Sequence, residues 1–266
     1  MDDELRARLE RSGYDGFGFA ADYDRFRPRP PSVLLELLPR LAATTRPKLV
    51  VDLGSGTGLS ARPWAAVADK VVGVEPNESM RTFAEQATVE PNVRYVGTSS
   101  YDTGIPPGSA DLVTAAQSLQ WMRRDEVFPE IARILRDGGV FCAFNYTVFQ
   151  SPLWEAAAAF DFVQDRKREL RLRLGLDSVS SPRPSVAWLR ESGVFREARE
   201  LLLHSIEEGD GERLIGFALS EGSMRTLLEA GVSEEEVGLD RLRAVAADMQ
   251  EAVPWWIGYR AWIGLK

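Results

Sequence analysis

The strongest constraint on the fold is a glycine-rich segment set between two short apolar runs. Val50–Leu53 leads into Gly54-Ser55-Gly56-Thr57-Gly58, and a second apolar run, Val71–Val74, ends in Glu75. Glycine accepts positive φ and lets backbone N–H groups approach a ligand without a Cβ in the way. A helix after the glycines would aim its unpaired N–H groups and positive dipole end into the same space. The pattern predicts a βαβ unit that binds a nucleoside, with Glu75 accepting hydrogen bonds from ribose hydroxyls.

The glycine spacing separates two kinds of nucleoside site. A dinucleotide site is usually signalled by G-x-G-x-x-G, with the pyrophosphate on a helix N-terminus. Here the glycines fall as G-x-G-x-G after Asp52. The run D-L-G-S-G-T-G resembles the first motif of class I S-adenosylmethionine-dependent methyltransferases. More narrowly, residues from about Ala21 to Asn145 are similar to methyltransferase type 11, the ubiquinone- and trans-aconitate-methyltransferase type.

The resemblance implies an α/β fold: a Rossmann-like, seven-stranded, mostly parallel sheet with an antiparallel last strand at its end and helical lid insertions. The implied division is an N-terminal helical cap (1–45), a cofactor-binding core (46–150), and a lid with the last two strands of the same domain (151–266). Apolar periodicity predicts helices at 59–68, after the glycine loop, and at 126–136, closed by Gly138 and Gly139. Residues 152–174 read as one long helix. Its basic run at 166–173 is interpreted as a solvated face rather than an anion-binding patch.

S-adenosylmethionine is the cofactor that the resemblance implies. It carries an ammonium, a carboxylate and a sulfonium but no phosphate, so an acid near the loop suits it. The implied cofactor-binding residues are Tyr23, Arg27, Asp52, Gly54, Ser55, Gly56, Gly58, Glu75, Pro76, Asn77, Met80, Ser99, Ser100 and Gln117.

Three of these implied roles can be stated more closely. Tyr23 and Arg27 would lie over the methionine end, with Arg27 facing its carboxylate. Asn77 and Met80 would lie beside the adenosine, although Met80 could equally fill the core. Relatives present a small residue and an acid to the adenine amino group; here the loop offers Ser99, Ser100 or Asp102, and the sequence does not choose among them.

The acceptor site is expected where two strands end, because ligands of open parallel sheets bind beyond the carboxyl ends of the strands. Residues 117–121 form the exit of the fourth strand, and Asn145 ends the fifth strand, expected at 140–145. Related sequences often carry histidine where Gln120 stands; glutamine orients a substrate but is no base near neutral pH. Trp121 could form a wall of the site or plug the sheet. The substrate-site candidates are Tyr14, Tyr23, Gln120, Trp121, Asn145 and Tyr146; no catalytic residue is assigned.

Methyl transfer from a sulfonium needs an acceptor held in line with the S–C bond and shielded from water. His204 is the only histidine, and it is interpreted as a solvent-facing strand residue that does not serve as a base. We therefore expect a methyltransferase (EC 2.1.1.-) that works by proximity, without a dedicated base. Its expected acceptor is a small molecule, methylated on oxygen, nitrogen or carbon. Two alternatives remain open: an enzyme that retains the methyl group during, for example, a cyclisation, and a cofactor-binding sensor. The glycine spacing disfavours a nicotinamide oxidoreductase.

Composition narrows the class of partner. A net charge of −8 argues against a nucleic-acid groove. The single cysteine, Cys142, lies in an apolar run and is expected to be buried. One cysteine and one histidine are too few for a multi-cysteine or histidine metal site, so no metal is expected. No apolar stretch approaches the roughly 20 residues of a membrane span, and the acidic N-terminus has no apolar leader. We therefore expect a cytoplasmic monomer or homodimer that does not contact a membrane.

Overall fold

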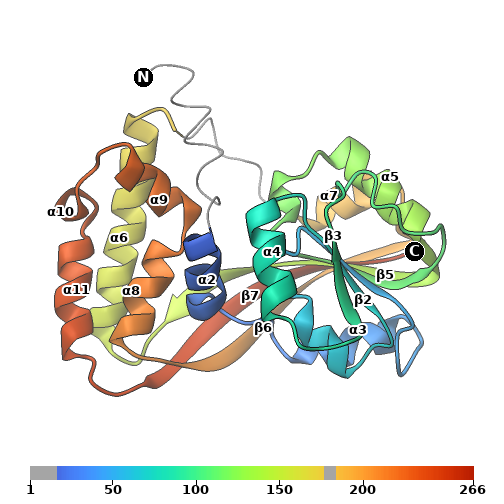
Figure 1. Ribbon diagram of the computed structural model, residues 1–266, viewed down its shortest axis with the longest axis horizontal. Coiled ribbons are helices and arrows are strands. Elements are labelled where there is room, and N and C mark those ends of the chain that lie inside the picture. The colour runs from blue at the N-terminus through green and yellow to red at the C-terminus, as the bar shows by residue number, and fades with distance from the viewer. Residues whose placement is uncertain (1–16, 177–183) are drawn as a thin grey trace. The chain divides into compact units, whose positions relative to one another are not determined.

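A seven-stranded sheet organises the computed structural model, which describes residues 17–176 and 184–266 (Figure 1). The strand order is β3-β2-β1-β4-β5-β7-β6. The strands are β1 (Val50–Leu53), β2 (Val71–Val74), β3 (Val93–Val96), β4 (Ala110–Ala116), β5 (Leu135–Gln150), β6 (Glu197–Gly209) and β7 (Val253–Leu265). β3, β2, β1, β4 and β5 pair in parallel. The predicted fold class is confirmed.

The last strand is antiparallel, but its predicted position at the sheet's end was wrong. The start of β5 pairs with the end of the chain: Gly138 N donates to Lys266 O at 3.1 Å, and Lys266 N donates to Gly139 O at 3.0 Å. β7 therefore lies between β5 and β6, and β6 is the edge strand. His204 is exposed on β6, as expected.

Helices connect these strands. They are α2 (Phe17–Phe26), α3 (Val33–Leu41), α4 (Glu78–Ala87), α5 (Arg124–Ile134), α6 (Trp154–Arg173), α7 (Val186–Glu191), α8 (Gly211–Leu219), α9 (Gly222–Glu229), α10 (Glu234–Val237) and α11 (Leu239–Asp248), with 3₁₀ turns η1 (Arg62–Ala66) and η2 (Leu119–Trp121). α6 confirms the long helix predicted at 152–174. The helix predicted at 126–136 begins and ends two residues earlier, because Leu135 already pairs with Ala110 as the first residue of β5. Gly138 and Gly139 consequently lie in a strand and do not close the helix.

The chain divides into two compact units, which we call the helical unit (segments 1–28, 148–181 and 206–257) and the sheet unit (29–147, 182–205 and 258–266). The helical unit contains α2, α6 and α8–α11. Its interior is aromatic: the Phe160 and Phe217 rings stack at 5.0 Å between centroids, and Phe149 meets Trp255 edge-on at 4.7 Å.

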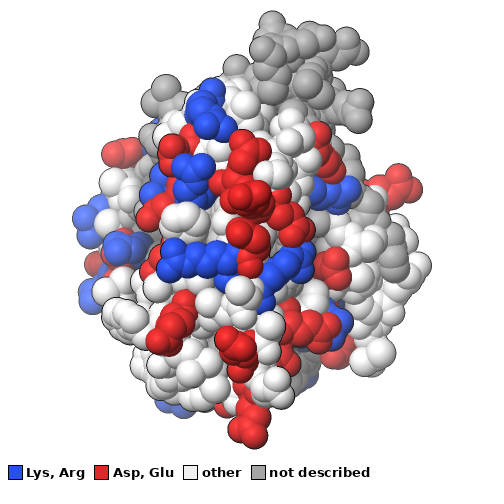
Figure 2. Space-filling view, turned by 90° about the vertical axis from the view of Figure 1, so that its left-hand side faces the viewer, with Lys and Arg blue, Asp and Glu red and all other residues white. Residues whose placement is uncertain are grey.

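Ion pairs occupy the surface of the helical unit. Figure 2 shows basic and acidic side chains interleaved on one face of the molecule. On α6, Arg166 pairs with Glu169 at 2.6 Å and Arg168 pairs with Asp165 at 3.0 Å, both within one turn. The basic run at 166–173 is thus largely a charge-balanced helix surface, in agreement with its interpretation as a solvated face. Lys167 is the exception, because its ammonium is buried against the carboxylate of Glu221.

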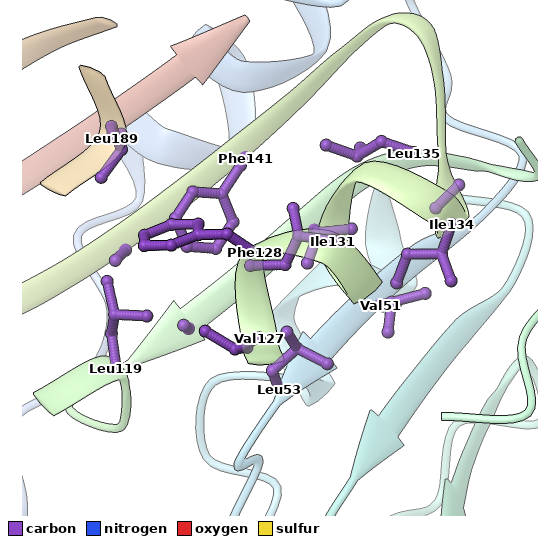
Figure 3. Packing of buried hydrophobic residues seen from close by; sticks show 14 of the residues in the cluster. Val51, Leu53, Leu119, Val127, Phe128, Ile131, Ile134, Leu135, Phe141 and Leu189 are labelled. Atoms are coloured by element: carbon purple, nitrogen blue, oxygen red, sulfur yellow. The ribbon is translucent and has the colours of Figure 1, made fainter. Parts of the chain in front are cut away.

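The core of the sheet unit lies between the strands and the helices α5 and α7 (Figure 3). All four positions of β1 are buried, as expected for a parallel strand covered on both faces. The Phe128 ring of α5 meets the Phe141 ring of β5 edge-on at 6.2 Å, and Phe141 stacks on Phe195 at 5.7 Å. Cys142 is fully buried in the same strand, and burial raises the pKa of its thiol.

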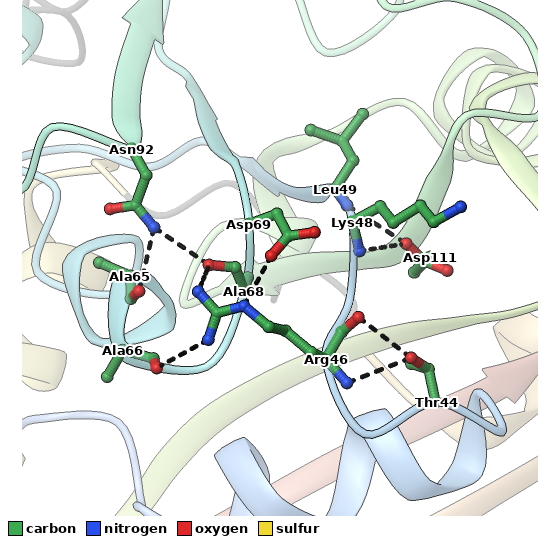
Figure 4. Close-up of polar contacts among 10 residues, drawn as sticks. All are labelled: Thr44, Arg46, Lys48, Leu49, Ala65, Ala66, Ala68, Asp69, Asn92 and Asp111. Carbon is green, nitrogen blue, oxygen red and sulfur yellow. Dashed lines mark hydrogen bonds and ion pairs between the residues drawn. The ribbon is translucent and has the colours of Figure 1, made fainter.

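Polar contacts fix the amino-terminal ends of the strands (Figure 4). The Arg46 guanidinium binds Asp69 Oδ1 at 2.6 Å and the Ala68 carbonyl at 2.8 Å, while Asp111 Oδ2 accepts from Lys48 N at 2.7 Å. Asn92 Nδ2, just before β3, donates to the Ala68 carbonyl at 3.0 Å. These bonds join the entries to β1, β2, β3 and β4 at one edge of the sheet, opposite the carboxyl edge.

Candidate functional site

The glycine loop after β1 has the backbone conformation that its sequence predicts. Gly54, Gly56 and Gly58 have φ of +66°, +54° and +81°, in the left-handed region that favours glycine. The loop is tied to the end of β2, because Gly54 N and Ser55 N both donate to the Val74 carbonyl, at 2.8 and 3.2 Å. The two halves of the motif therefore meet at the carboxyl edge of the sheet.

Glu75 connects the end of β2 to this loop. Its Oε2 accepts from Gly56 N and its Oε1 accepts from Asn77 N, each at 2.8 Å. The residue is 8% exposed, and this burial raises the pKa of its carboxyl. The two backbone hydrogen bonds lower the pKa, but by less than burial raises it. Each carboxylate oxygen has a second lone pair. Glu75 can thus bind two neighbouring hydroxyls without giving up the loop.

The prediction of a helix at 59–68 was wrong. Tight turns follow the loop instead, with Gly58 N donating to the Ser55 carbonyl at 2.9 Å and Ala61 N to the Gly58 carbonyl at 3.1 Å, before η1. Pro63 has no N–H to continue a helical ladder from η1. The loop therefore lacks a long helix whose dipole would favour phosphate, and its own amides and the neighbouring acids set its chemistry.

Tyr95 of β3 supports the loop from below, a role that sequence reasoning missed. A Cβ at Gly58 would overlap the Tyr95 hydroxyl, and a Cβ at Gly73 would lie 2.5 Å from Tyr95 Cδ1. The hydroxyl also shares a 2.8 Å hydrogen bond with Thr88 Oγ1. Both glycines are therefore needed to admit the ring. Gly73, alone inside an apolar strand, was the available signal, because such glycines often mark close approach.

Asp52 braces the loop from within the sheet. It is completely buried, its Oδ2 accepts from Ser60 Oγ at 2.5 Å, and its Oδ1 accepts from Thr114 Oγ1 at 2.7 Å. Burial raises the pKa of this carboxyl to about 6, although the two hydroxyls lower it in part. Both oxygens are used inside the protein, so the side chain joins β1, the loop and β4.

The predicted adenosine-side residues follow Glu75 along the chain. Pro76 is exposed, and Asn77 caps α4 by accepting from Met80 N at 3.0 Å. Met80 is 5% exposed and its Cε lies 3.5 Å from where a Cβ on Gly56 would be. It therefore lies directly behind the loop.

The loop after β3 closes on itself. Ser99 and Asp102 form a β-bridge, and Ser99 Oγ accepts from Tyr101 N at 3.1 Å. Ser100 is buried and Asp102 is exposed. These positions do not single out one residue for the adenine amino group.

Three carboxamides form a chain between the residues that follow β4 and an interior position of β5. β5 continues to Gln150, so the predicted end of the fifth strand at Asn145 was wrong. Gln117 has φ of +54°, unusual for a residue with a Cβ, and its N–H donates to the Phe144 carbonyl at 2.9 Å. Gln120 Nε2 donates to the Gln117 carbonyl at 2.7 Å, and Asn145 Nδ2 donates to Gln120 Oε1 at 3.2 Å. We call these residues the carboxamide chain. Trp121 beside it is 65% exposed, so it does not plug the sheet.

Buried polar atoms without a hydrogen-bond partner gather at the same edge. Within residues 17–176 and 184–266 they include Ser55 Oγ and Thr57 Oγ1 in the glycine loop, and Gln117 Nε2 and Asn145 Oδ1 in the carboxamide chain. Ser55 Oγ lies toward Gly73, under the loop. Buried polar atoms are normally paired, so these four are the atoms at this edge whose hydrogen bonds a ligand would complete.

The remaining predicted residues belong to neither the glycine loop nor the carboxamide chain. Tyr23 and Arg27 are in the helical unit, where the Arg27 guanidinium lies 4.9 Å from the Tyr23 ring centre and donates to the Ser220 carbonyl at 3.1 Å. Tyr146 meets Tyr259 edge-on in the sheet unit at 6.5 Å. Tyr14 falls outside the described residues.

The described residues contain neither a cluster of metal ligands nor a membrane-spanning helix. No group of three or more histidine, cysteine, aspartate or glutamate side chains there is arranged to hold a metal ion. None of the helices in the described ranges combines the length and the apolarity needed to cross a membrane.

Comparison with known sequences adds to this geometry. Residues 51–143 match the family model described as a methyltransferase domain. A Saccharomyces cerevisiae protein described as a probable S-adenosylmethionine-dependent methyltransferase is 26% identical over 179 residues, or 61% of either chain. An uncharacterized methyltransferase of Mycobacterium tuberculosis is 34% identical over 125 residues, covering 46% of this chain and 49% of that one. This chain spans about half to three fifths of the length of the curated relatives it matches.

Solved structures share the fold. A protein from Anaeromyxobacter dehalogenans described as a type II methyltransferase has a TM-score of 0.67 at 24% identity, over 90% of this chain and 98% of that one. Phosphoethanolamine N-methyltransferase 2 of Haemonchus contortus, solved with phosphomonomethylethanolamine and S-adenosylhomocysteine, has a TM-score of 0.54 at 19% identity, over 98% of this chain and 60% of that one. At these identities the likeness concerns the fold.

Proposed function

We propose that this chain, which belongs to the class I S-adenosylmethionine-dependent methyltransferases through its domain at residues 51–143, transfers a methyl group from that cofactor to a small-molecule acceptor. The observation that carries the proposal is the Glu75 carboxylate, bonded to Gly56 N at 2.8 Å across the glycine loop. An acid in this position presents paired acceptors to ribose hydroxyls beside backbone amides that can approach the ligand closely.

The residues of the loop fit a nucleoside without phosphates. Acids flank it on both sides, Asp52 inside β1 and Glu75 after β2, and the turns that follow it are too short to supply a helix dipole. The carboxyl edge also holds unpartnered Thr57 Oγ1, Gln117 Nε2 and Asn145 Oδ1 among the described residues. This mixture of neutral donors and acceptors suits hydroxyls and a zwitterion.

Bound S-adenosylmethionine supplies a methyl group activated by the sulfonium. The protein's part is to hold the acceptor in line with that group and to keep water out. Trp121 has enough exposed area to form a wall of the acceptor site, and Tyr146 lies on the neighbouring strand, β5. Asp52 is unsuited to be a base, because both oxygens are hydrogen-bonded inside the fold. We infer a reaction driven by proximity and orientation.

The acceptor atom is left open by the relatives. One is named a ubiquinone/menaquinone biosynthesis C-methyltransferase, from Hydrogenovibrio crunogenus, at 33% identity over 122 residues that cover 43% of this chain and 47% of that one. Others are named for different acceptors, and the alignments cover only part of each protein. We therefore propose a small molecule methylated on oxygen, nitrogen or carbon.

Calorimetric titration with S-adenosylmethionine and S-adenosylhomocysteine tests the cofactor site. Glu75→Ala should weaken both by about ten- to a hundredfold, the equivalent of about 1.5–3 kcal/mol for charge-assisted hydrogen bonds. Glu78→Ala is the matched control, because it removes an exposed carboxylate three positions along the chain in the first turn of α4. Wild-type protein that binds neither ligand, or that binds NAD instead, would contradict the proposal.

A further inference from the structure

We propose that residues 199–205 of β6, which we call the edge segment, pair with the same residues of a second copy of this chain. The pairing is antiparallel and forms a homodimer with Leu202 on its two-fold axis. The edge segment takes no part in the function proposed above, so the dimer is independent of methyl transfer. Three features of β6 support the pairing: its open side, its lack of protecting residues and the order of its side chains.

β6 leaves one side of its backbone open. It is the last strand in the sheet order, with β7 as its neighbour, and within residues 17–176 and 184–266 no strand pairs with its other side. Alternate residues of an edge strand turn their N–H and C=O groups away from the sheet, where they can pair with another chain. β6 runs for 13 residues, about twice the usual strand length, so the open row is long. The edge segment lies wholly in the sheet unit.

The edge segment lacks the usual protection against such pairing. Natural edge strands are commonly blunted by lysine, proline, a bulge or a short length. Residues 199–205 read R-E-L-L-L-H-S, without lysine or proline. Leu202 is 72% exposed, and His204 is exposed two positions along, on the same face of the strand. An exposed apolar side chain on a long, open edge favours association with another strand.

A two-fold axis at Leu202 gives the edge segment complementary partners. Glu200 of each copy then faces His204 of the other, and the central leucines face one another. A carboxylate accepts a hydrogen bond from an imidazole N–H whether or not the ring is charged. Complementary side chains directly opposite each other stabilise a sheet, whereas like charges in that arrangement destabilise it. The polar residues of the segment therefore favour its own copy as the partner.

Neighbouring registers lose this match. With the axis at Leu201, Glu200 would face Leu202, and with the axis at Leu203 it would face Ile206. Either register sets the carboxylate against an apolar side chain, and His204 likewise faces an apolar residue in both. Because burying a charged group beside apolar atoms costs free energy, the axis at Leu202 is favoured.

The Glu200 carboxylate is already oriented by its own chain. Its Oε1 accepts from Arg260 Nη1 at 2.7 Å and its Oε2 accepts from Trp262 Nε1 at 2.8 Å, both on β7 in the sheet unit. The Glu200 side chain is 30% exposed, and each of its oxygens keeps a further lone pair. Because these bonds have ordered the side chain beforehand, accepting from an imidazole costs little additional conformational entropy.

Introduced cysteines locate the axis. Leu202→Cys places two Cα atoms about 4.5–5.5 Å apart across the axis, within the range of a disulfide. His204→Cys is the matched control on the same face, because its copy lies four residues along the strand, about 14 Å away. The native Cys142 is fully buried and does not compete. In a buffer of reduced and oxidised glutathione, Leu202→Cys should form a covalent dimer on a non-reducing gel and His204→Cys should not. Equal yields in the two variants, including none in either, overturn the pairing.

Sedimentation equilibrium measures the affinity of the dimer without a covalent link. One pair of strands is a small interface, so we expect a wild-type dissociation constant of about 1–100 µM. His204→Lys should tighten the dimer and His204→Glu should weaken it, each by about three- to thirtyfold, because the pair with Glu200 occurs twice.

Leu172→Lys and Leu172→Glu are the matched controls for net charge. This leucine is 58% exposed on α6, and its variants change the net charge by the same amounts as those at position 204. Both should keep the dissociation constant within about twofold of wild type. Wild-type protein that stays monomeric at about 300 µM, or shifts at position 172 equal to those at 204, overturns the dimer.

Discussion

The stability of the Asp52→Asn variant relative to wild type should increase as the pH rises. The wild-type carboxyl is fully buried between β1 and β4, and burial raises its pKa from 3.8 to about 6. The variant keeps the shape of the side chain and can still bond Ser60 and Thr114, whose hydroxyls can rotate to accept or donate. It carries no charge at any pH.

The size of the effect follows from linkage between proton binding and folding. Below the unfolded pKa, Asp52 is protonated in both states and costs nothing. Between pH 3.8 and about 6 the folded state binds more protons than the unfolded state, so stability falls as the pH rises. Above the folded pKa the cost is complete, about two pKa units at 1.36 kcal/mol each, or about 3 kcal/mol. Asp52→Asn escapes this loss.

Urea unfolding from pH 4 to 7.5 measures the difference in unfolding free energy between Asp52→Asn and wild type. Carboxylates that do not interact with Asp52 titrate equally in both proteins and cancel from that difference; Glu75, whose charge also raises the Asp52 pKa, is the exception. About 0.5 kcal/mol of the full cost is already present at pH 4, so we expect the difference to change by about 2.5 kcal/mol in favour of the variant between pH 4 and 7.5. Ser60→Ala removes a hydroxyl that lowers the Asp52 pKa, and should move the window to higher pH. Parallel curves, within about 0.5 kcal/mol at every pH, would refute the buried-charge reasoning.

Three further outcomes are expected. Gly58→Ala should destabilise the protein more than Gly104→Ala and should also weaken the binding of S-adenosylhomocysteine. Both glycines have positive φ, which costs an alanine about 1–2 kcal/mol, but only a Cβ at Gly58 would meet a side chain. Equal melting temperatures of the two variants would argue against support of the loop by Tyr95. Glu130→Gln should lower the free energy of unfolding by about 1–3 kcal/mol at pH 7. Burial alone would raise the pKa of the Glu130 carboxyl, but hydrogen bonds from Arg133 and Thr103 lower it overall. In urea unfolding, the difference between variant and wild type should therefore diminish as the pH falls below 4.5. Glu221→Gln should lower the free energy of unfolding by about 3 kcal/mol, because it leaves the buried Lys167 ammonium without a countercharge. The double variant with Lys167→Met should recover part of that loss in the same assay. No recovery would refute the pairing.

The glycine loop and Glu75 could be predicted because their requirements are local. Positive φ at Gly54, Gly56 and Gly58 is a property of single residues, and the apolar run of β2 places the acid one residue beyond the strand. The parallel order of the first five strands follows from the same alternation of apolar strands and connecting segments.

The misses depend on contacts between distant parts of the chain. Tyr95 enters the space under Gly58 from a strand 37 positions later, and no pattern near the loop records it. The turns at 59–66 replace a helix because Ser60 bonds Asp52 and Pro63 cannot donate. The position of β7 inside the sheet is decided by pairing between Lys266 and the first residues of β5.

The two acids of the motif show most clearly what sequence spacing leaves undecided. Asp52 and Glu75 both follow apolar residues on adjacent strands, and the same reading assigns both to the cofactor. Asp52 still lies inside the sheet, paired in register with Gly73 and Thr114, so its carboxylate meets hydroxyls of the fold and is used up there. Glu75 stands one residue past β2, where backbone amides take one lone pair of each oxygen and leave the other available. One acid therefore holds the loop in place while the other is free to bind, and a single position along a strand decides between the two roles.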